Sequence, residues 1–123
     1  MILVDTSVWV GHFRSVDPLL RDLLTRKLVV VHPFVIGELA LGPPHQRAAA
    51  LGSMPRMRLV SIAGDHEVLD MIEQYALFDR GIGFVDVHLL ASALITPETQ
   101  LWSRDRRLNA AAERLGVAAR LTH

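Results

Sequence analysis

The stretch Met1-Ile2-Leu3-Val4-Asp5-Thr6-Ser7-Val8-Trp9 decides the fold. A short apolar run ends at Asp5, a pattern that is typical of a buried strand in a parallel sheet. In parallel α/β sheets, ligands bind at the carboxyl ends of the strands. Asp5 is therefore either a ligand-binding residue or the N-cap of a helix that begins at Thr6, and this segment leaves both roles open.

The rest of the chain repeats this alternation of short apolar runs and helical patterns. We expect further strands at residues 28–31 and 100–102, an extended segment at 57–62 and an edge strand from Val117. Leucines at helical spacing follow the helix start Asp17-Pro18. We expect the other helices over residues 33–41, 45–51, 65–78, 84–95 and 106–115. The pattern predicts an α/β fold with three layers, a central parallel sheet flanked by helices.

Length and composition predict one domain over residues 1–123. The chain has no cysteine, which excludes a disulfide scaffold, a thiolate metal site and cysteine catalysis. No apolar run approaches the roughly 20 residues that a membrane helix needs, and no basic segment of a signal peptide precedes Ile2. We therefore expect a cytoplasmic protein.

Four acidic residues stand where a solvated surface charge is not expected. Asp5 and Asp105 follow apolar strands, whereas Glu38 and Asp86 lie in apolar helices with no cation three or four residues away. Each also has an ordinary interpretation. Asp105 could cap the last helix, and Asp86 could be an N-cap, although the residue three positions later is Leu89 and no capping box results.

If the sheet gathers these acids at one edge, they form a carboxylate cluster. Such a cluster needs a cation, because like charges at short range raise one another's pKa. Ligands that are all oxygen select hard ions such as Mg²⁺ or Mn²⁺. A bound ion of this kind suits phosphodiester hydrolysis, since it neutralises phosphate charge and activates water. No HExxH zinc motif, complete glycine-rich phosphate loop or GxSxG motif offers a competing site.

These residues resemble the PIN-domain toxins of bacterial VapBC toxin–antitoxin systems over essentially the whole chain. The resemblance rests on residues 1–9, Glu38, Asp86 before a Leu/Ala helix, and Leu101-Trp102-Ser103-Arg104-Asp105. It implies a PIN fold, a Mg²⁺- or Mn²⁺-dependent endoribonuclease, a homodimer and a cognate VapB-like antitoxin. It assigns Asp5, Glu38, Asp86 and Asp105 to the catalytic metal site, with Ser103, Thr6 and Ser7 in support. Many relatives carry one more acid where this chain has Arg107.

Two other functions fit some of the same features. A PIN-like DNA nuclease would use the same acids, but those enzymes carry additional DNA-binding elements that this short chain lacks. A non-catalytic receiver-type Mg²⁺-binding domain also places acids at strand ends, but it needs a lysine on a late strand. The sole lysine here is Lys27.

The formal net charge of zero conceals an uneven distribution of charge. Residues 1–60 carry +3, residues 61–100 carry −6 and residues 101–123 carry +3. Twelve of the thirteen cations are arginine, which suits bidentate contact with phosphate. We expect Arg104 and Arg106 to contact the RNA backbone near Asp105.

Overall fold

The computed structural model describes residues 1–121 and places a small parallel sheet at the centre of the molecule. Strand β1 (Ile2–Val4) lies between β2 (Val29–Val30) and β3 (Gln100–Trp102), and both neighbours run parallel to it. Ile2 is in register with Val29 on one side and with Gln100 on the other. The predicted α/β class with a central parallel sheet is confirmed.

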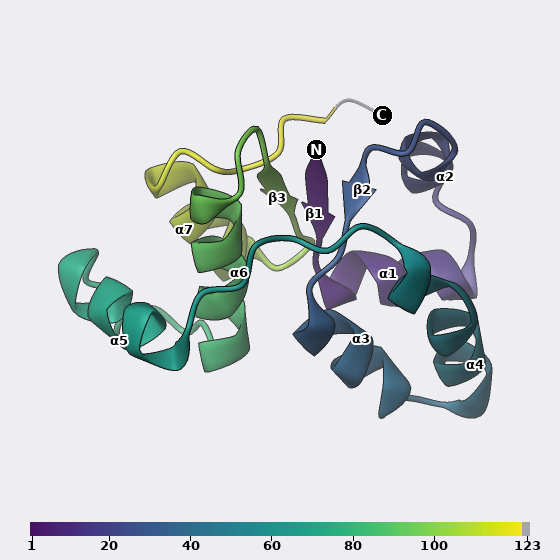
Figure 1. The fold of residues 1–123 in the computed structure, drawn as a ribbon, viewed down its shortest axis with the longest axis horizontal. Helices are drawn as coiled ribbons and strands as arrows, with labels where there is room; N and C mark the ends of the chain where they lie inside the picture. The colour runs from purple at the N-terminus through teal and green to yellow at the C-terminus, as the bar shows by residue number, and fades with distance from the viewer. Residues whose placement is uncertain (122–123) are drawn as a thin grey trace.

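Helices flank the sheet, as Figure 1 shows. Helices α5, α6 and α7 lie on the β3 side of β1, and helices α1 to α4 lie on the β2 side. The bounds of the helices within residues 1–121 are α1 (Thr6–Arg14), α2 (Pro18–Thr25), α3 (Pro33–Ala40), α4 (Pro44–Ser53), the 3-10 helix η1 (Met54–Arg56), α5 (Asp65–Gln74), α6 (Phe84–Ile95) and α7 (Arg106–Arg114).

The core forms around β1 and α6, two of the apolar segments of the chain. All three residues of β1 are buried, as a central strand covered by helices requires. Helix α6 is buried at every residue from 87 to 93, so that its apolar surface meets protein on nearly all sides. Burial of these two elements fixes the carboxyl end of β1 and the first turn of α6 relative to each other.

Several elements are shorter than the sequence pattern predicts. Strand β2 has two residues rather than four, and helix α5 ends at Gln74 rather than at residue 78. The backbone takes the left-handed conformation at Ala76 (φ 51°), which a right-handed helix cannot include. The expected extended segments near residues 59 and 118 each form a single parallel bridge, Val31 with Leu59 and Leu101 with Ala118.

His32 connects the end of the β2 segment to α3. It is the N-cap of this helix, and its Nδ1 accepts a hydrogen bond from the backbone N–H of Phe34 at 3.0 Å. The side chain is fully buried, and burial lowers the pKa of His32 to about 4, with a further contribution from His88. A neutral imidazole is therefore the form that caps α3, since the acceptor nitrogen must remain unprotonated.

The free energy of unfolding should fall as the pH falls from 6.5 towards 4. The unfolded chain binds a proton at His32 near pH 6.5, whereas the folded chain resists protonation until about pH 4, so acid favours unfolding in this window. The loss should be on the order of 2–3 kcal/mol. Urea unfolding at pH 7 and pH 5 should show a smaller pH effect for His32→Asn, which keeps a capping oxygen. Exposed His45→Asn should behave as wild type, and an unchanged pH effect in His32→Asn would contradict the assignment.

Candidate active site

Asp5 lies at the carboxyl end of the central strand and begins α1. It is buried, and its side chain accepts from the backbone N–H of Ser7, so it is an N-cap as well as a strand-end acid. Its Oδ2 also accepts from Ser7 Oγ at 2.6 Å and from Ser103 Oγ at 2.8 Å. Three donors on one oxygen hold this carboxylate in a single orientation.

The two serines that bind Asp5 also hold the segment that follows β3. Ser103 Oγ accepts the backbone N–H of Asp105 at 2.9 Å, and Ser7 Oγ accepts the backbone N–H of Arg104 at 3.0 Å. The carboxyl ends of β1 and β3 are thus joined through side-chain hydroxyls. Ser7 and Ser103 therefore fix the carboxylate of Asp5 relative to the segment that carries Asp105.

Glu38 reaches the same end of the sheet from α3. Its Oε1 accepts a hydrogen bond of 2.6 Å from Thr6 Oγ1, the first residue of α1. Glu38 is exposed, so its charge remains in water, which agrees with its lack of a cationic partner in the sequence.

Asp86 lies in the first turn of α6. Gly83 is the N-cap, and the backbone N–H of Gly83 donates to Asp86 Oδ2 at 2.9 Å. Asp86 is thus the third residue of a capping-box arrangement, not an N-cap that would need a partner at Leu89. The expectation that Asp86 could be an N-cap is therefore wrong, because the cap lies three residues earlier, at Gly83.

Asp105 begins α7 as its N-cap. Its Oδ1 accepts the backbone N–H of Arg107 at 2.8 Å and that of Leu108 at 3.2 Å. The predicted capping role is confirmed. The side chain is exposed, so it also faces solvent at the carboxyl end of β3.

The four carboxylates share one region, and the pKa of Asp86 reflects this. Burial raises the pKa of Asp86 above its usual value, and the hydrogen bond from Gly83 opposes this shift. The negative charges of Asp5, Asp105 and Glu38 raise it further. Within residues 1–121, however, no three His, Asp or Glu side chains are grouped so that they could hold a metal ion together. The four acids thus influence one another electrostatically and supply the oxygen donors that Mg²⁺ prefers, but they are not drawn together around one point.

Arginines surround Asp105 on the side that faces solvent. A hollow of about 720 Å³, which we call the Asp105 hollow, is lined by Gly81, Arg104, Asp105, Arg106, Arg107 and Ala110. The guanidinium of Arg104 donates to Asp17 Oδ2 at 2.7 Å, whereas Arg106 is exposed. Arg107 lines the hollow together with Arg104 and Arg106, although only the latter two were predicted to contact RNA and all three belong to one run of arginines.

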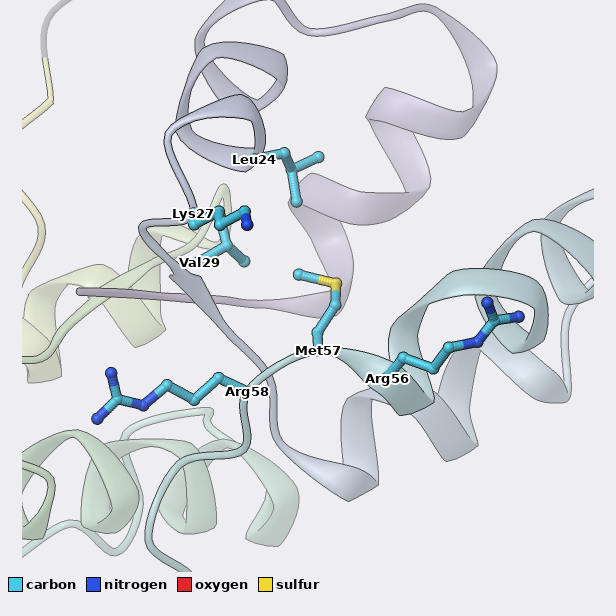
Figure 2. Close-up of a pocket in the computed structure, with 6 residues that line it drawn as sticks. All are labelled: Leu24, Lys27, Val29, Arg56, Met57 and Arg58. Carbon is cyan, nitrogen blue, oxygen red and sulfur yellow. The ribbon is translucent and has the colours of Figure 1, made fainter.

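A second hollow of about 560 Å³ lies between the α2–β2 turn and the segment after η1. It is lined by Leu24, Lys27, Val29, Arg56, Met57 and Arg58. Figure 2 shows Met57 pointing into it, while Arg56 and Arg58 extend in opposite directions on either side. Cations that diverge in this way do not form a phosphate site, and we assign this hollow no role in the reaction.

No helix within residues 1–121 is long and apolar enough to span a membrane.

Known proteins share both the sequence and the fold of this chain. Residues 2–114 match the PIN domain family. The chain is 42% identical over 118 residues to Ribonuclease VapC32 from two strains of Mycobacterium tuberculosis, covering 96% of this chain and 95% of the relative. The crystal structure of PAE2754 from Pyrobaculum aerophilum has the same fold, with a TM-score of 0.61 and 18% identity. That match covers 91% of this chain and 79% of PAE2754. The chain therefore belongs to the PIN-domain family and, within it, to the VapC-like ribonuclease toxins.

Proposed function

We propose that this protein is a Mg²⁺-dependent endoribonuclease, the toxin of a type II toxin–antitoxin system. The observation that carries the proposal is the half-buried carboxylate of Asp86, whose pKa is raised in part by Asp5, Asp105 and Glu38. A cluster of this kind is stable at neutral pH when a cation neutralises it. The 42% identity to Ribonuclease VapC32 supports RNA as the substrate.

The four acids differ in burial, and we assign their roles accordingly. Asp5 and Asp86 are the least exposed of the four acids, and we assign them direct contact with the ion. Glu38 and Asp105 are exposed and would act through water or hold a second ion. The bound ion would neutralise charge on the scissile phosphate and make a water easier to deprotonate.

The remaining residues orient these acids and the substrate. Ser7 and Ser103 fix Asp5 through its Oδ2, and Thr6 fixes Glu38. The exposed Arg106 lines the Asp105 hollow, where its guanidinium would bind a phosphate of the RNA strand. Arg104 lines the same hollow but pairs with Asp17, so we assign it a weaker contact with RNA.

The proposal extends to the partners and the compartment. A VapC-like toxin implies a VapB-like antitoxin that holds the enzyme inactive, and we propose a homodimer within a larger toxin–antitoxin complex. The absence of cysteine is compatible with a reducing cytoplasm, where its RNA substrates occur.

Purified protein should cleave structured RNA when Mg²⁺ or Mn²⁺ is present. Excess EDTA should abolish cleavage, and added Mg²⁺ should restore it, because the carboxylates alone supply no Lewis acid. Single-stranded DNA of the same sequence is the control that separates this function from that of a PIN-like DNA nuclease. Undiminished RNA cleavage in EDTA would overturn the metal dependence, and equal cleavage of DNA would overturn the substrate class.

A further inference from the structure

The arginines beside Asp105 continue along α7, away from the acids. A hollow of about 280 Å³, which we call the α7 hollow, is lined by Arg80, Arg107, Ala110, Ala111 and Arg114. It shares Arg107 and Ala110 with the Asp105 hollow, so the two adjoin along one side of the helix. The spacing of 107, 110, 111 and 114 places these residues on one face of α7.

The arginines at the far end of the α7 hollow are held in place by the turn that follows α5. Arg114 Nη2 donates to the carbonyl oxygen of Tyr75 at 2.6 Å, and Arg80 Nε donates to that of Ala76 at 2.7 Å. A guanidinium has five N–H donors, so each arginine keeps further donors for a ligand. Both cations are therefore positioned before any ligand binds, which reduces the entropy lost on binding.

Arg107 is held where the two hollows meet. A Cβ atom on Gly81 would collide with Nη1 of Arg107, so the chain at Gly81 lies directly against this side chain. Gly81 also has φ 74°, a conformation that glycine adopts at little cost. The alanines between the arginines leave the hollow open, because neither Ala110 nor Ala111 fills it.

We propose that the α7 hollow binds the phosphodiester backbone of the RNA strand next to the cleavage site. This inference rests on the proposed function, because the Asp105 hollow supplies the route to the reacting phosphate. The lining contains three arginines and no acid, which is complementary to phosphate. From Arg107 to Arg114 the helix rises about 10 Å, a length that roughly three stacked nucleotides span.

Binding of RNA by the double variant Arg107→Ala/Arg114→Ala tests the proposal. The probe is a labelled single-stranded RNA of about twelve nucleotides in EDTA, so that affinity is measured without cleavage. We expect affinity to fall about 10-fold or more, and the slope of log K against log salt to become shallower by about 1.4, or 0.7 for each lost phosphate contact. Arg107→Lys/Arg114→Lys keeps both charges and should retain most of the salt dependence.

The matched control removes two arginines from the hollow of about 560 Å³ beside η1, which lies apart from the acids. Arg56 and Arg58 diverge there, so Arg56→Ala/Arg58→Ala should leave RNA affinity near that of wild type (Figure 2). An equal loss in this control would show that overall charge matters and would overturn the proposal. Thermal unfolding of each variant identifies any loss of fold, because Arg114 also binds Tyr75.

Two further measurements distinguish this proposal from the proposed function. They are the binding of RNAs of different length and the cleavage of long RNA. A trinucleotide that occupies only the Asp105 hollow should bind wild type and Arg114→Ala equally, because Arg114 lines the α7 hollow alone, whereas Arg107 lines both hollows. If wild type cleaves RNA and the double variant binds and cleaves long RNA equally well, the α7 hollow has no role and the enzyme function stands. If wild type cleaves no RNA but the double variant still binds it less tightly, the hollow stands and the enzyme function fails.

Discussion

Replacement of Asp86 by asparagine is expected to lower RNA cleavage by about 100-fold or more. This loss is larger than is usual for a residue that only hydrogen-bonds to a metal ligand. The amide oxygen can still accept from the Gly83 backbone, so α6 should keep its first turn. The charge of Asp86 is disfavoured by burial and by three neighbouring acids, so its loss should not lower the melting temperature of the metal-free protein. Mg²⁺ should raise the melting temperature of wild type more than that of Asp86→Asn.

Glu67→Gln is the matched control. Glu67 Oε1 accepts the backbone N–H of Gly64 at 3.1 Å and so has the same relation to α5 that Asp86 has to α6. This variant should retain wild-type cleavage and the full effect of Mg²⁺ on stability. Initial rates on one RNA, measured over a range of Mg²⁺ concentrations, compare the two. Cleavage by Asp86→Asn within a few-fold of wild type would remove Asp86 from the metal site.

Leu3→Ala is expected to lower the free energy of unfolding by about 3 kcal/mol, within the 2–5 kcal/mol typical of large-to-small changes in a core. Leu3 is fully buried in the central strand and pairs with Val30 and Leu101 on its two sides. The helices that cover the sheet cannot close the resulting cavity completely. Since domains of this size are stable by roughly 5–15 kcal/mol, the variant should still fold at room temperature.

Leu41→Ala makes the same chemical change at a residue that is 89% exposed. It should change the free energy of unfolding by less than about 0.5 kcal/mol, as is usual for surface positions. Urea unfolding followed by circular dichroism gives the midpoint and the slope m for both variants. Equal midpoints for Leu3→Ala and Leu41→Ala would contradict the buried position of β1.

Local patterns predicted those parts of the fold that local chemistry decides. Apolar composition predicted α6 at residues 84–95, and the proline after Asp17 predicted the start of α2. The pattern failed at α5, because its alternation of apolar and polar residues continues beyond Gln74, where the backbone turns at Ala76. Nothing in the sequence near Ala76 marks that turn, since alanine is an ordinary helix former.

The acids of the candidate site were predictable because each lies where a surface charge is unusual. Their relation to other parts of the chain was not. Arg104 pairs with Asp17 across 87 residues, and Ser103 reaches Asp5 across 98 residues. Such contacts depend on the tertiary arrangement of β1, β3 and α2, which no short pattern encodes. Capping geometry at Asp86 was missed although the predicted start of α6 was right, because its partner is the backbone N–H of Gly83, a residue with no side chain to signal a cap.

Two polar interactions join the segment after β3 to the N-terminal helices, and they affect the conformational entropy that the site loses on binding. The backbone N–H of Arg104 donates to Ser7 Oγ, and its guanidinium pairs with the buried Asp17 at the start of α2. The residues that carry Asp105 therefore lose their conformational freedom when the chain folds, not when an ion or RNA arrives. A preorganised carboxylate of this kind lets more of the binding free energy appear as affinity.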